Sequence, residues 1–283
     1  MRKKYNPKHS KLILGTAQFG KPYGINNIGK KRISKSSIKK ILSFSHRKKI
    51  NHLDTAFEYD FNFKLLGTKK QWLVDTKIII REKQNMLSHF GNKLKRIFKL
   101  KNIKISTIYI HNPQMIFTKN GKKIFQMLNE MKKSKLIKNI GISIYEPSLL
   151  TKIIKKFNVD VVQLPYNILD RRFEKYFTYL NKKGINVYVR SVFLQGLLLS
   201  KKENKLTKSE ELKRFTTFSR ETKISKENLC LQFVMSNKSI KKIIFGVDDL
   251  KQLKSISKIK KIKKLQSNFL STKNLNIIDP RRW

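Results

Sequence analysis

The sequence predicts an α/β protein built as a closed (β/α)8, or TIM, barrel with a C-terminal helical tail. Three observations lead to this fold class: eight short apolar runs recur along the chain, amphipathic helical stretches lie between them, and turn residues stand at the junctions. The chain has 283 residues, and no linker rich in Pro, Gly or Ser divides it. We therefore expect residues 1–283 to form a single barrel domain.

Each candidate strand is an apolar run rich in Ile, Val and Leu and bounded by polar residues. Such runs are typical of parallel strands that are buried on both faces. In chain order the candidate strands are Leu12–Leu14, Ile50–Leu53, Trp72–Ile80, Ile105–Ile110, Ile140–Ser143, Val159–Leu164, Val187–Arg190 and Ile243–Val247.

The stretches between the strands carry apolar residues at helical spacing, and Pro or Gly marks their ends. Strands that alternate with helices form either a closed parallel barrel or a doubly wound sheet. The first strand is not followed by a Gly-rich phosphate loop, which argues against the doubly wound alternative. The clearest helical stretches are Ser34–Lys48, Asn120–Lys133, Pro147–Lys156 and Arg171–Lys183.

Two segments near the C-terminus carry separate expectations. Lys201–Ser209 is polar throughout and is expected to form a long loop. The tail from Ser257 is rich in Lys, and Ile256, Ile259 and Ile262 are spaced so that one face of a helix docks on the barrel.

The formal charge of +47 raises the question of a polyanionic partner. Lys far outnumbers Arg and is spread over every segment, and neither zinc-finger spacing nor an aromatic RNA-binding signature is present. The pattern favours a generally basic surface without a specific nucleic-acid partner, and it predicts weak binding to polyanions at low salt.

The sequence also bears on the compartment. No apolar run reaches the roughly 20 residues that span a bilayer, and the start of the chain shows only Leu12–Leu14 as an apolar stretch, which is too short for a signal peptide. Cys230 is the only cysteine, and it lies in an apolar helical stretch where we expect a packed thiol. We therefore expect a cytoplasmic protein without a membrane partner.

Four chemically active side chains stand after the ends of three short apolar runs, Ile50–Leu53, Trp72–Val74 and Ile105–Ile110. They are a carboxylate, a phenol, an ammonium and an imidazole, at Asp54, Tyr59, Lys77 and His111. Barrel enzymes build their sites at the C-terminal ends of the strands. The four residues are therefore predicted to converge at one mouth of the barrel, as a site that reduces a carbonyl group, and no metal site is predicted.

The chain resembles the aldo/keto reductase family over nearly its whole length. The resemblance rests on eight segments in family order, each at a strand end. They are LILGTAQFGKPYGINN from Leu12, HLDTAFEY from His52, DTK at 75–77, YIHNP at 109–113, NIGISIYEP from Asn139, VVQLPYNILDRR from Val161, RSVFLQGLL from Arg190 and IIFGVDDLKQL from Ile243.

The resemblance implies a mechanism in which a reduced nicotinamide donates a hydride to a carbonyl carbon and Tyr59 supplies the proton. A free phenol has a pKa of about 10, and the Lys77 ammonium is expected to lower it. Asp54 would hold that ammonium charged, and His111 would orient the carbonyl by a hydrogen bond. Asp54 and Tyr59 are five residues apart, which matches the family spacing.

The resemblance also implies cofactor contacts. Gly15 and Thr16 match positions near the nicotinamide ribose, and Ser143 and Gln163 match the pair that binds the carboxamide. The family usually has Asn where Ile144 stands, and usually stacks a Tyr on the nicotinamide where this chain has Arg190. The residues that match the pyrophosphate loop are Ser191, Phe193 and Leu194, of which the last two are as readily explained by packing.

At the adenine end the chain departs from the family pattern. The cofactor residues expected there are Gly246, Asp248 and Gln252, and no Arg is present to bind a 2′-phosphate. Asp248 would repel that phosphate or accept a hydrogen bond from a ribose hydroxyl, as acidic residues do in NAD sites. Family habit favours NADP and these residues do not, so the sequence leaves NADP and NAD open. The lysines that could compensate are Lys242, Lys251 and Lys254.

Two other classes of function compete with a carbonyl reductase. One is a non-catalytic regulatory barrel that binds nicotinamide, and the other is a basic nucleic-acid-binding protein. The substrate is expected to be a small carbonyl compound, and the resemblance of the opening and of the segment from Arg190 to bacterial members found in sugar gene clusters suggests a sugar-type one. Its pocket would come from the variable segments around Tyr23, Phe57, Asp60–Phe63, Pro113–Phe117 and Leu197–Ser209.

Overall fold

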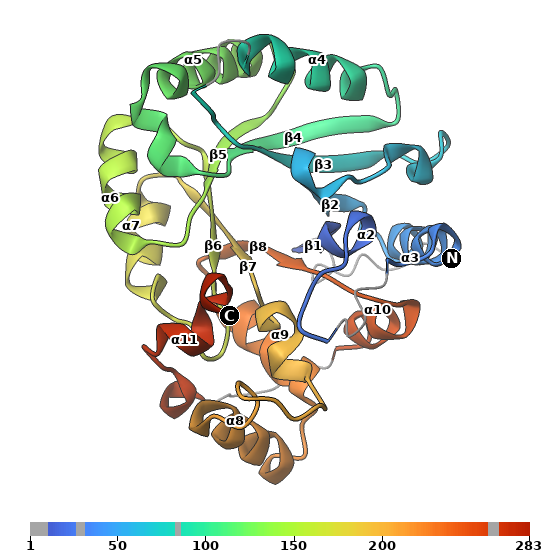
Figure 1. The fold of residues 1–283 in the computed structure, drawn as a ribbon, viewed down its shortest axis with the longest axis vertical. Helices are drawn as coiled ribbons and strands as arrows, with labels where there is room; N and C mark the ends of the chain where they lie inside the picture. The colour runs from blue at the N-terminus through green and yellow to red at the C-terminus, as the bar shows by residue number, and fades with distance from the viewer. Residues whose placement is uncertain (1–10, 27–31, 83–85, 260–265) are drawn as a thin grey trace.

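The computed structural model describes residues 11–26, 32–82, 86–259 and 266–283. Eight parallel strands pair in sequence order and close into a barrel, because β1 pairs with β8 as well as with β2. Helices surround the strands (Figure 1), so the predicted (β/α)8 class is confirmed. The strands are β1 Leu12–Gly15, β2 His52–Asp54, β3 Trp72–Ile78, β4 Ile103–Ile110, β5 Asn139–Ser143, β6 Val161–Pro165, β7 Asn186–Arg190 and β8 Ile240–Phe245.

The larger helices begin at Ser or Thr residues whose side chains accept a hydrogen bond from the backbone of the first turn. Ser34, Thr118, Ser209 and Ser225 are such caps, and each satisfies an amide that the helix leaves unpaired. The helices are α2 Ala17–Gly20, α3 Lys35–Arg47, α4 Met86–Phe98, α5 Lys119–Lys133, α6 Pro147–Lys156, α7 Phe177–Lys182, α8 Glu210–Glu221, α9 Lys226–Ser236, α10 Leu250–Ser257 and α11 Leu275–Ile278.

Some strand boundaries differ from the sequence prediction, and local hydrogen bonds explain the difference. The second strand begins at His52 because the amide of Ile50 is bound to the carbonyl of Ser45 in the preceding turn. The third strand ends at Ile78, since the side chain of Asn112 forms hydrogen bonds of 2.8 Å with both the backbone amide and the backbone carbonyl of Ile80. In both cases the apolar run in the sequence is longer than the strand that the backbone hydrogen bonds form.

Two predicted helices are shorter than expected. The stretch from Arg171 begins with a turn and a 3-10 segment, η4 Glu174–Tyr176, before α7, because Arg171 and Arg172 bind the C-terminal region instead of continuing a helix. Helix α10 ends at Ser257, so Ile259 lies beyond it, and Ile262 falls outside the described residues. Lys201–Ser209 forms turns between η5, Leu194–Leu199, and α8, as predicted.

The core has two parts. Most buried apolar residues lie between the strands and the surrounding helices, and Cys230, which is fully buried in α9, is among them. A smaller cluster fills the inside of the barrel and consists of Ile13, Tyr109, Val161, Tyr188 and Ile244.

The inside of the barrel also holds polar groups. The carboxylate of Asp75 is fully buried there, with Nε2 of His52 at 2.9 Å and the hydroxyl of Tyr109 at 3.4 Å. Burial and the charge of Asp75 raise the pKa of Tyr109. The barrel is therefore a packed interior with no open channel below the mouth.

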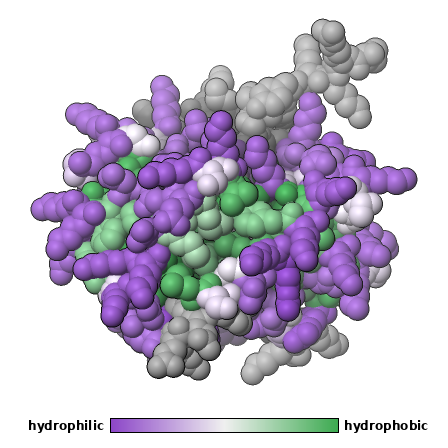
Figure 2. Space-filling model, turned by 90° about the horizontal axis from the view of Figure 1, so that it is seen from above, coloured by the Kyte–Doolittle hydropathy of each residue, from purple (hydrophilic) through white to green (hydrophobic). Residues whose placement is uncertain are grey.

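The surface is strongly hydrophilic. On the face in Figure 2, hydrophilic side chains surround a band of apolar residues on all sides and do not gather in one patch. Within the part of the chain that the structure describes, no helix combines the length and the apolar character needed to cross a membrane.

Gly141 offers a test of the inner packing. An added Cβ there would lie 2.4 Å from Cδ1 of Tyr109, whose ring is fully buried and cannot move aside. Gly141→Ala should lower the melting temperature by about 3–8 °C, through overpacking of about 1–3 kcal/mol. Gly91→Ala is the matched control, because nothing lies within 4 Å of that Cβ and helix propensity favours Ala. Equal melting temperatures for the two variants would contradict the tight inner packing.

Candidate active site

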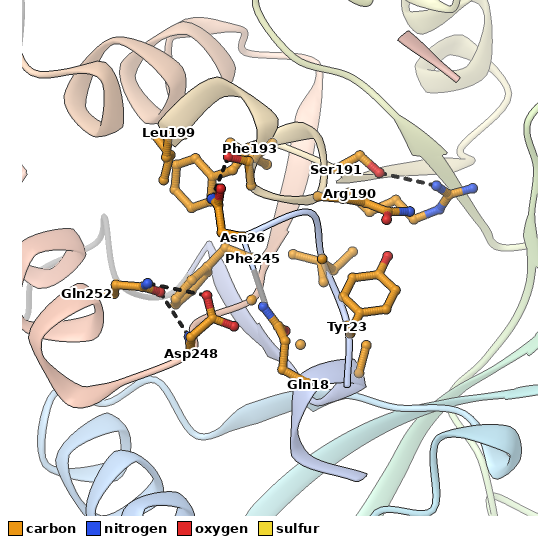
Figure 3. A pocket seen from close by; sticks show the side chains of 18 of the residues that line it. Gln18, Tyr23, Asn26, Arg190, Ser191, Phe193, Leu199, Phe245, Asp248 and Gln252 are labelled. Carbon is orange, nitrogen blue, oxygen red and sulfur yellow. Dashed lines mark hydrogen bonds between the residues drawn. The ribbon is translucent and has the colours of Figure 1, made fainter. Parts of the chain in front are cut away.

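A cavity of about 460 Å³ opens where the strands end. Its walls include Gly15, Asp54, Ser143 and Arg190, each the last residue of its strand, so the cavity lies at the C-terminal mouth of the barrel. Figure 3 shows Tyr23 and Arg190 on one side of the cavity and Asp248 and Gln252 on another. The volume is in the range of pockets that hold a small molecule or a cofactor.

A buried ion pair forms the floor of this cavity. Nζ of Lys77 lies 2.5 Å from Oδ2 of Asp54 and donates a second hydrogen bond of 3.0 Å to the carbonyl of Thr55. Lys77 is only 1% exposed and Asp54 only 5%. A buried ammonium is stable only when it is paired, so the pair keeps Lys77 charged inside the barrel mouth.

Tyr59 follows β2 in a 3-10 turn, η1 Phe57–Tyr59, and its ring centroid lies 5.3 Å from Nζ of Lys77. Gly20 lets α2 pack against this turn, because a Cβ there would lie 1.7 Å from the carbonyl of Tyr59. Burial, followed by the charge of Asp54, raises the pKa of Tyr59, while Arg190 lowers it. The expected lowering by Lys77 is not what this arrangement produces, since burial has the largest effect.

His111 comes directly after β4, and its backbone amide donates to the carbonyl of Ile78 at 2.7 Å. Its ring meets that of Tyr59 edge to face, with centroids 6.5 Å apart. Nδ1 is buried and has no hydrogen-bond partner among the described residues. Burial, with smaller effects from Lys77 and Arg190, lowers the pKa of His111 to about 4, so the imidazole is neutral at neutral pH.

Eight of the residues predicted to bind the cofactor line the cavity. They are Gly15, Ser143, Arg190, Ser191, Phe193, Gly246, Asp248 and Gln252. Gln18 packs closely against Gly246, because a Cβ at Gly246 would lie 2.2 Å from Oε1 of Gln18, so a larger residue there would require the Gln18 side chain to move.

Three other predicted cofactor residues do not line the cavity, and their contacts explain why. Thr16 donates its amide, at 2.9 Å, and its hydroxyl, at 3.2 Å, to the carbonyl of Asp54. Gln163 donates its side-chain amide to Oδ1 of Asp54 at 2.7 Å and accepts from Ser143 at 3.3 Å. Leu194 is fully buried, which supports the packing alternative for that residue.

The segment after β7 has an unusual backbone. Ser191, Leu194, Gln195 and Gly196 all have positive φ, between 48° and 91°. Asn167, itself fully buried, donates to the carbonyl of Ser191 at 3.0 Å and braces the turn. Such non-glycine conformations persist only where the surroundings enforce them, and they cluster at ligand sites.

The same segment fits the pyrophosphate of a dinucleotide. Val192 and Phe193 line the cavity, and in the described part of the chain their backbone amides have no acceptor. Free amides in a tight turn form an anion-binding concavity. The segment after α2 contacts this turn, because Ile25 donates to the carbonyl of Gln195 at 3.0 Å and the side chain of Asn26 to that of Gly196 at 2.8 Å.

At the far end of the cavity Asp248 and Gln252 bind each other. Gln252 accepts from the amide of Asp248 at 2.9 Å, and its own amide lies 3.3 Å from Oδ2 of Asp248. None of the lysines that the sequence suggested as compensating cations, Lys242, Lys251 and Lys254, lines the cavity. Lys201 and Lys202, from the polar loop, line it together with Glu227.

Sequence reasoning missed several other lining residues, among them Tyr145, Gln18 and Ser255. Tyr145 stands two residues after the end of β5, so its position was a usable signal, whereas Lys202 is one lysine among many.

Of the segments expected to form the substrate pocket, Tyr23 and part of Leu197–Ser209 do line the cavity. Phe61 instead packs against Phe63 and Phe19, with ring centroids 5.1 and 6.1 Å apart.

Comparison with known proteins identifies the family. A parallel barrel with these groups at its C-terminal mouth defines a candidate oxidoreductase of the nicotinamide-dependent class. The sequence model of the aldo/keto reductase family matches residues 11–275, and the chain therefore belongs to that family. It is an NAD(P)-dependent oxidoreductase that acts on carbonyl groups.

Individual relatives are distant in sequence. A Bacillus subtilis protein named as an uncharacterized oxidoreductase is 22% identical over 236 residues, which cover 72% of this chain and 76% of the relative. An aldo-keto reductase from Bacillus halodurans, in its holo form, matches with a TM-score of 0.71 at 20% identity, over 96% of this chain and 95% of that one. A glycerol dehydrogenase from Gluconobacter oxydans matches with a TM-score of 0.68 at 15% identity, over 95% and 92%. These structural matches show the shared fold.

The protonation of His111 can be measured directly. Since the folded pKa of about 4 lies below the ordinary value of 6.5, this histidine opposes folding increasingly as the pH falls through that interval. In NMR spectra of protein with ¹⁵N-labelled histidine, the signal that His111→Gln removes should titrate near pH 4. A midpoint near 6.5 would show that the ring is solvated and not held in the cavity.

Proposed function

We propose that the protein reduces an aldehyde or ketone to an alcohol with NADH or NADPH, and that Tyr59 is the proton donor. The observation that supports this proposal is the grouping of Asp54, Tyr59, Lys77 and His111 around one cavity, with the first and third joined in a buried ion pair. When bound, a reduced nicotinamide supplies the hydride.

The side chains can each contribute a definite effect. Burial raises the pKa of Tyr59, so its hydroxyl is protonated at neutral pH. It donates this proton as negative charge develops on the substrate oxygen. Neutral His111 offers an N–H donor to the same oxygen. Lys77, paired with Asp54, lies beside the ring of Tyr59, where its ammonium favours the phenolate that remains, although burial has the larger effect on the pKa of Tyr59.

The proposed cofactor contacts divide between side chains and backbone. Gly15 and Ser143 would lie beside the nicotinamide end, and the amides of Val192 and Phe193 would hold the pyrophosphate. The residues at the adenosine end would be Asp248 and Gln252, and Lys202 lines the same cavity.

The substrate is proposed to be small and polar. The cavity wall beside Tyr59 carries the side chains of Tyr23, Tyr145 and Arg190, which offer hydroxyl and guanidinium groups. These groups suit an oxygen-rich compound of sugar type. One structural relative is named as a glycerol dehydrogenase. In that relative, the shared fold accommodates a polyhydroxy substrate.

Replacing the proton donor separates catalysis from binding. Tyr59→Phe keeps the ring and removes the hydroxyl, so kcat should fall by about 10²- to 10⁴-fold, while the cofactor Kd changes little. The control is Tyr179→Phe, on the exposed side of α7, where the ring is 42% exposed. Assays of NADH and NADPH oxidation with a panel of aldehydes and ketones measure the effect. Unchanged turnover in Tyr59→Phe would refute the proposed role, and a wild type that binds NADPH but reduces no carbonyl would favour a regulatory barrel.

Cofactor choice tests the adenosine end. Asp248 would repel a 2′-phosphate, and Lys202 is a mobile point charge without the planar fork of Arg. We therefore expect weak discrimination between NADH and NADPH, and Asp248→Ser should shift the Kd ratio toward NADPH by about tenfold, or about 1.4 kcal/mol. Asp249→Asn removes the same charge from a neighbour that does not line the cavity. Strong NADPH preference in the wild type, unaffected by Asp248→Ser, would assign the choice to the lysines.

A further inference from the structure

Arg190 is a cation without an anionic partner inside the candidate active site. It is the last residue of β7, it is partly buried, and it lines the cavity on the side of Tyr23 (Figure 3). In the ranges that the structure describes, no Asp or Glu oxygen lies within 4.0 Å of its guanidinium. Its two hydrogen bonds, to Oγ of Ser191 and the carbonyl of Ile144, are both long, at 3.4 Å.

The guanidinium is nevertheless held in place. It stacks on the ring of Tyr145, with the central carbon 3.9 Å from the ring centroid. The guanidinium of Arg281 lies 4.2 Å from the same centroid and is in turn bound to Asp279 at 2.7 Å and Glu146 at 3.3 Å. The C-terminal segment therefore helps to fix Tyr145, and through it the plane of Arg190.

None of the carboxylates near the reacting groups is bound to Arg190, although its charge also acts on Asp170, which is bound to Arg172 at 2.9 Å. The charges of Lys77 and Asp54 offset each other in one ion pair, and His111 is neutral at neutral pH. Arg190 is near enough for its charge to act on both Tyr59 and His111. A partly buried cation without a partner carries a desolvation cost that a bound anion would offset.

We propose that the substrate is a carbonyl compound that also carries a carboxylate, and that Arg190 binds this carboxylate. The proposal rests on the proposed carbonyl reduction at the same site. A planar guanidinium binds a carboxylate through two parallel hydrogen bonds, which would replace the long contacts to Ser191 and Ile144. The carbonyl would then lie between Tyr59 and His111, whose ring centroids are 6.5 Å apart.

Two other anions are less well matched to Arg190. The cofactor phosphates have a separate candidate site in the backbone amides of Val192 and Phe193. A substrate phosphate would bring close to two negative charges, whereas Arg190 carries one positive charge and the carboxylate of Asp54 lines the same cavity. One negative charge balances the site.

The test compares 4-oxobutanoate with its neutral methyl ester as paired aldehydes, and glyceraldehyde 3-phosphate with glyceraldehyde as the phosphate pair. In the wild type kcat/KM should favour the acid over the ester, and Arg190→Met should reduce that ratio by about 10- to 100-fold, as expected for loss of a hydrogen-bonded charge pair. Arg190→Lys should restore part of the ratio. Arg214→Met, an exposed position on α8, changes the net charge equally and should leave the ratio unaltered.

A binding experiment separates this proposal from the proposed reaction. Butanoate and butanamide are titrated calorimetrically into the protein with NADP⁺ present, using wild type and Arg190→Met. Butanoate binding that depends on Arg190 supports the carboxylate site even if no aldehyde is reduced, an outcome that would refute only the proposed reaction. Equal use of acid and ester by an active wild type overturns the carboxylate site, as does a stronger preference for the phosphate. A loss of cofactor affinity in Arg190→Met with an unchanged acid-to-ester ratio would assign Arg190 to the cofactor.

Discussion

The buried carboxylate of Asp54 connects the strands that form the mouth of the barrel. Its two oxygens bind Lys77 on β3 and Gln163 on β6, and its backbone carbonyl binds Thr16 after β1. Ser143 on β5 joins the network through Gln163. The carboxylate thus binds side chains from two other strands, and Asp54 as a whole links four other parts of the barrel. Because an unpaired carboxylate at this depth would be costly, each of these hydrogen bonds supports the others.

Burial at the mouth has opposite effects on the two uncharged candidate groups, and both effects suit a proton-donating site. Burial raises the pKa of Tyr59 and lowers that of His111, since in each case it disfavours the charged form. Both groups are therefore neutral donors at neutral pH. They lie beside the ion pair of Lys77 with Asp54 and beside Arg190. The site thus combines neutral donors with fixed charges, an arrangement that can stabilise charge as it develops on a bound substrate.

The sequence predicted the barrel and located the four candidate groups, because strand ends in a parallel barrel converge whatever the details of packing. It could not predict contacts that depend on side-chain direction. Thr16 and Gln163 stand at strand ends as expected, yet both bind Asp54, and only the three-dimensional packing decides between Asp54 and the cavity. Lys202 could not be singled out, because the chain has many similar lysines. The sequence was as compatible with Phe61 in a substrate wall as with the packing that Phe61 adopts.

The substrate side of the mouth depends on the part of the chain that is farthest in sequence from the ion pair. Asp279 is almost fully buried and binds both Arg172 and Arg281, so it anchors the C-terminal segment against the turn after β6. Arg281 then contacts Tyr145, which contacts Arg190. The Asp54–Lys77 ion pair is formed by adjacent strands, whereas the position of Arg190 relies on contacts from outside the barrel. Under the proposed carboxylate site, the substrate contact could therefore change while the ion pair stays in place.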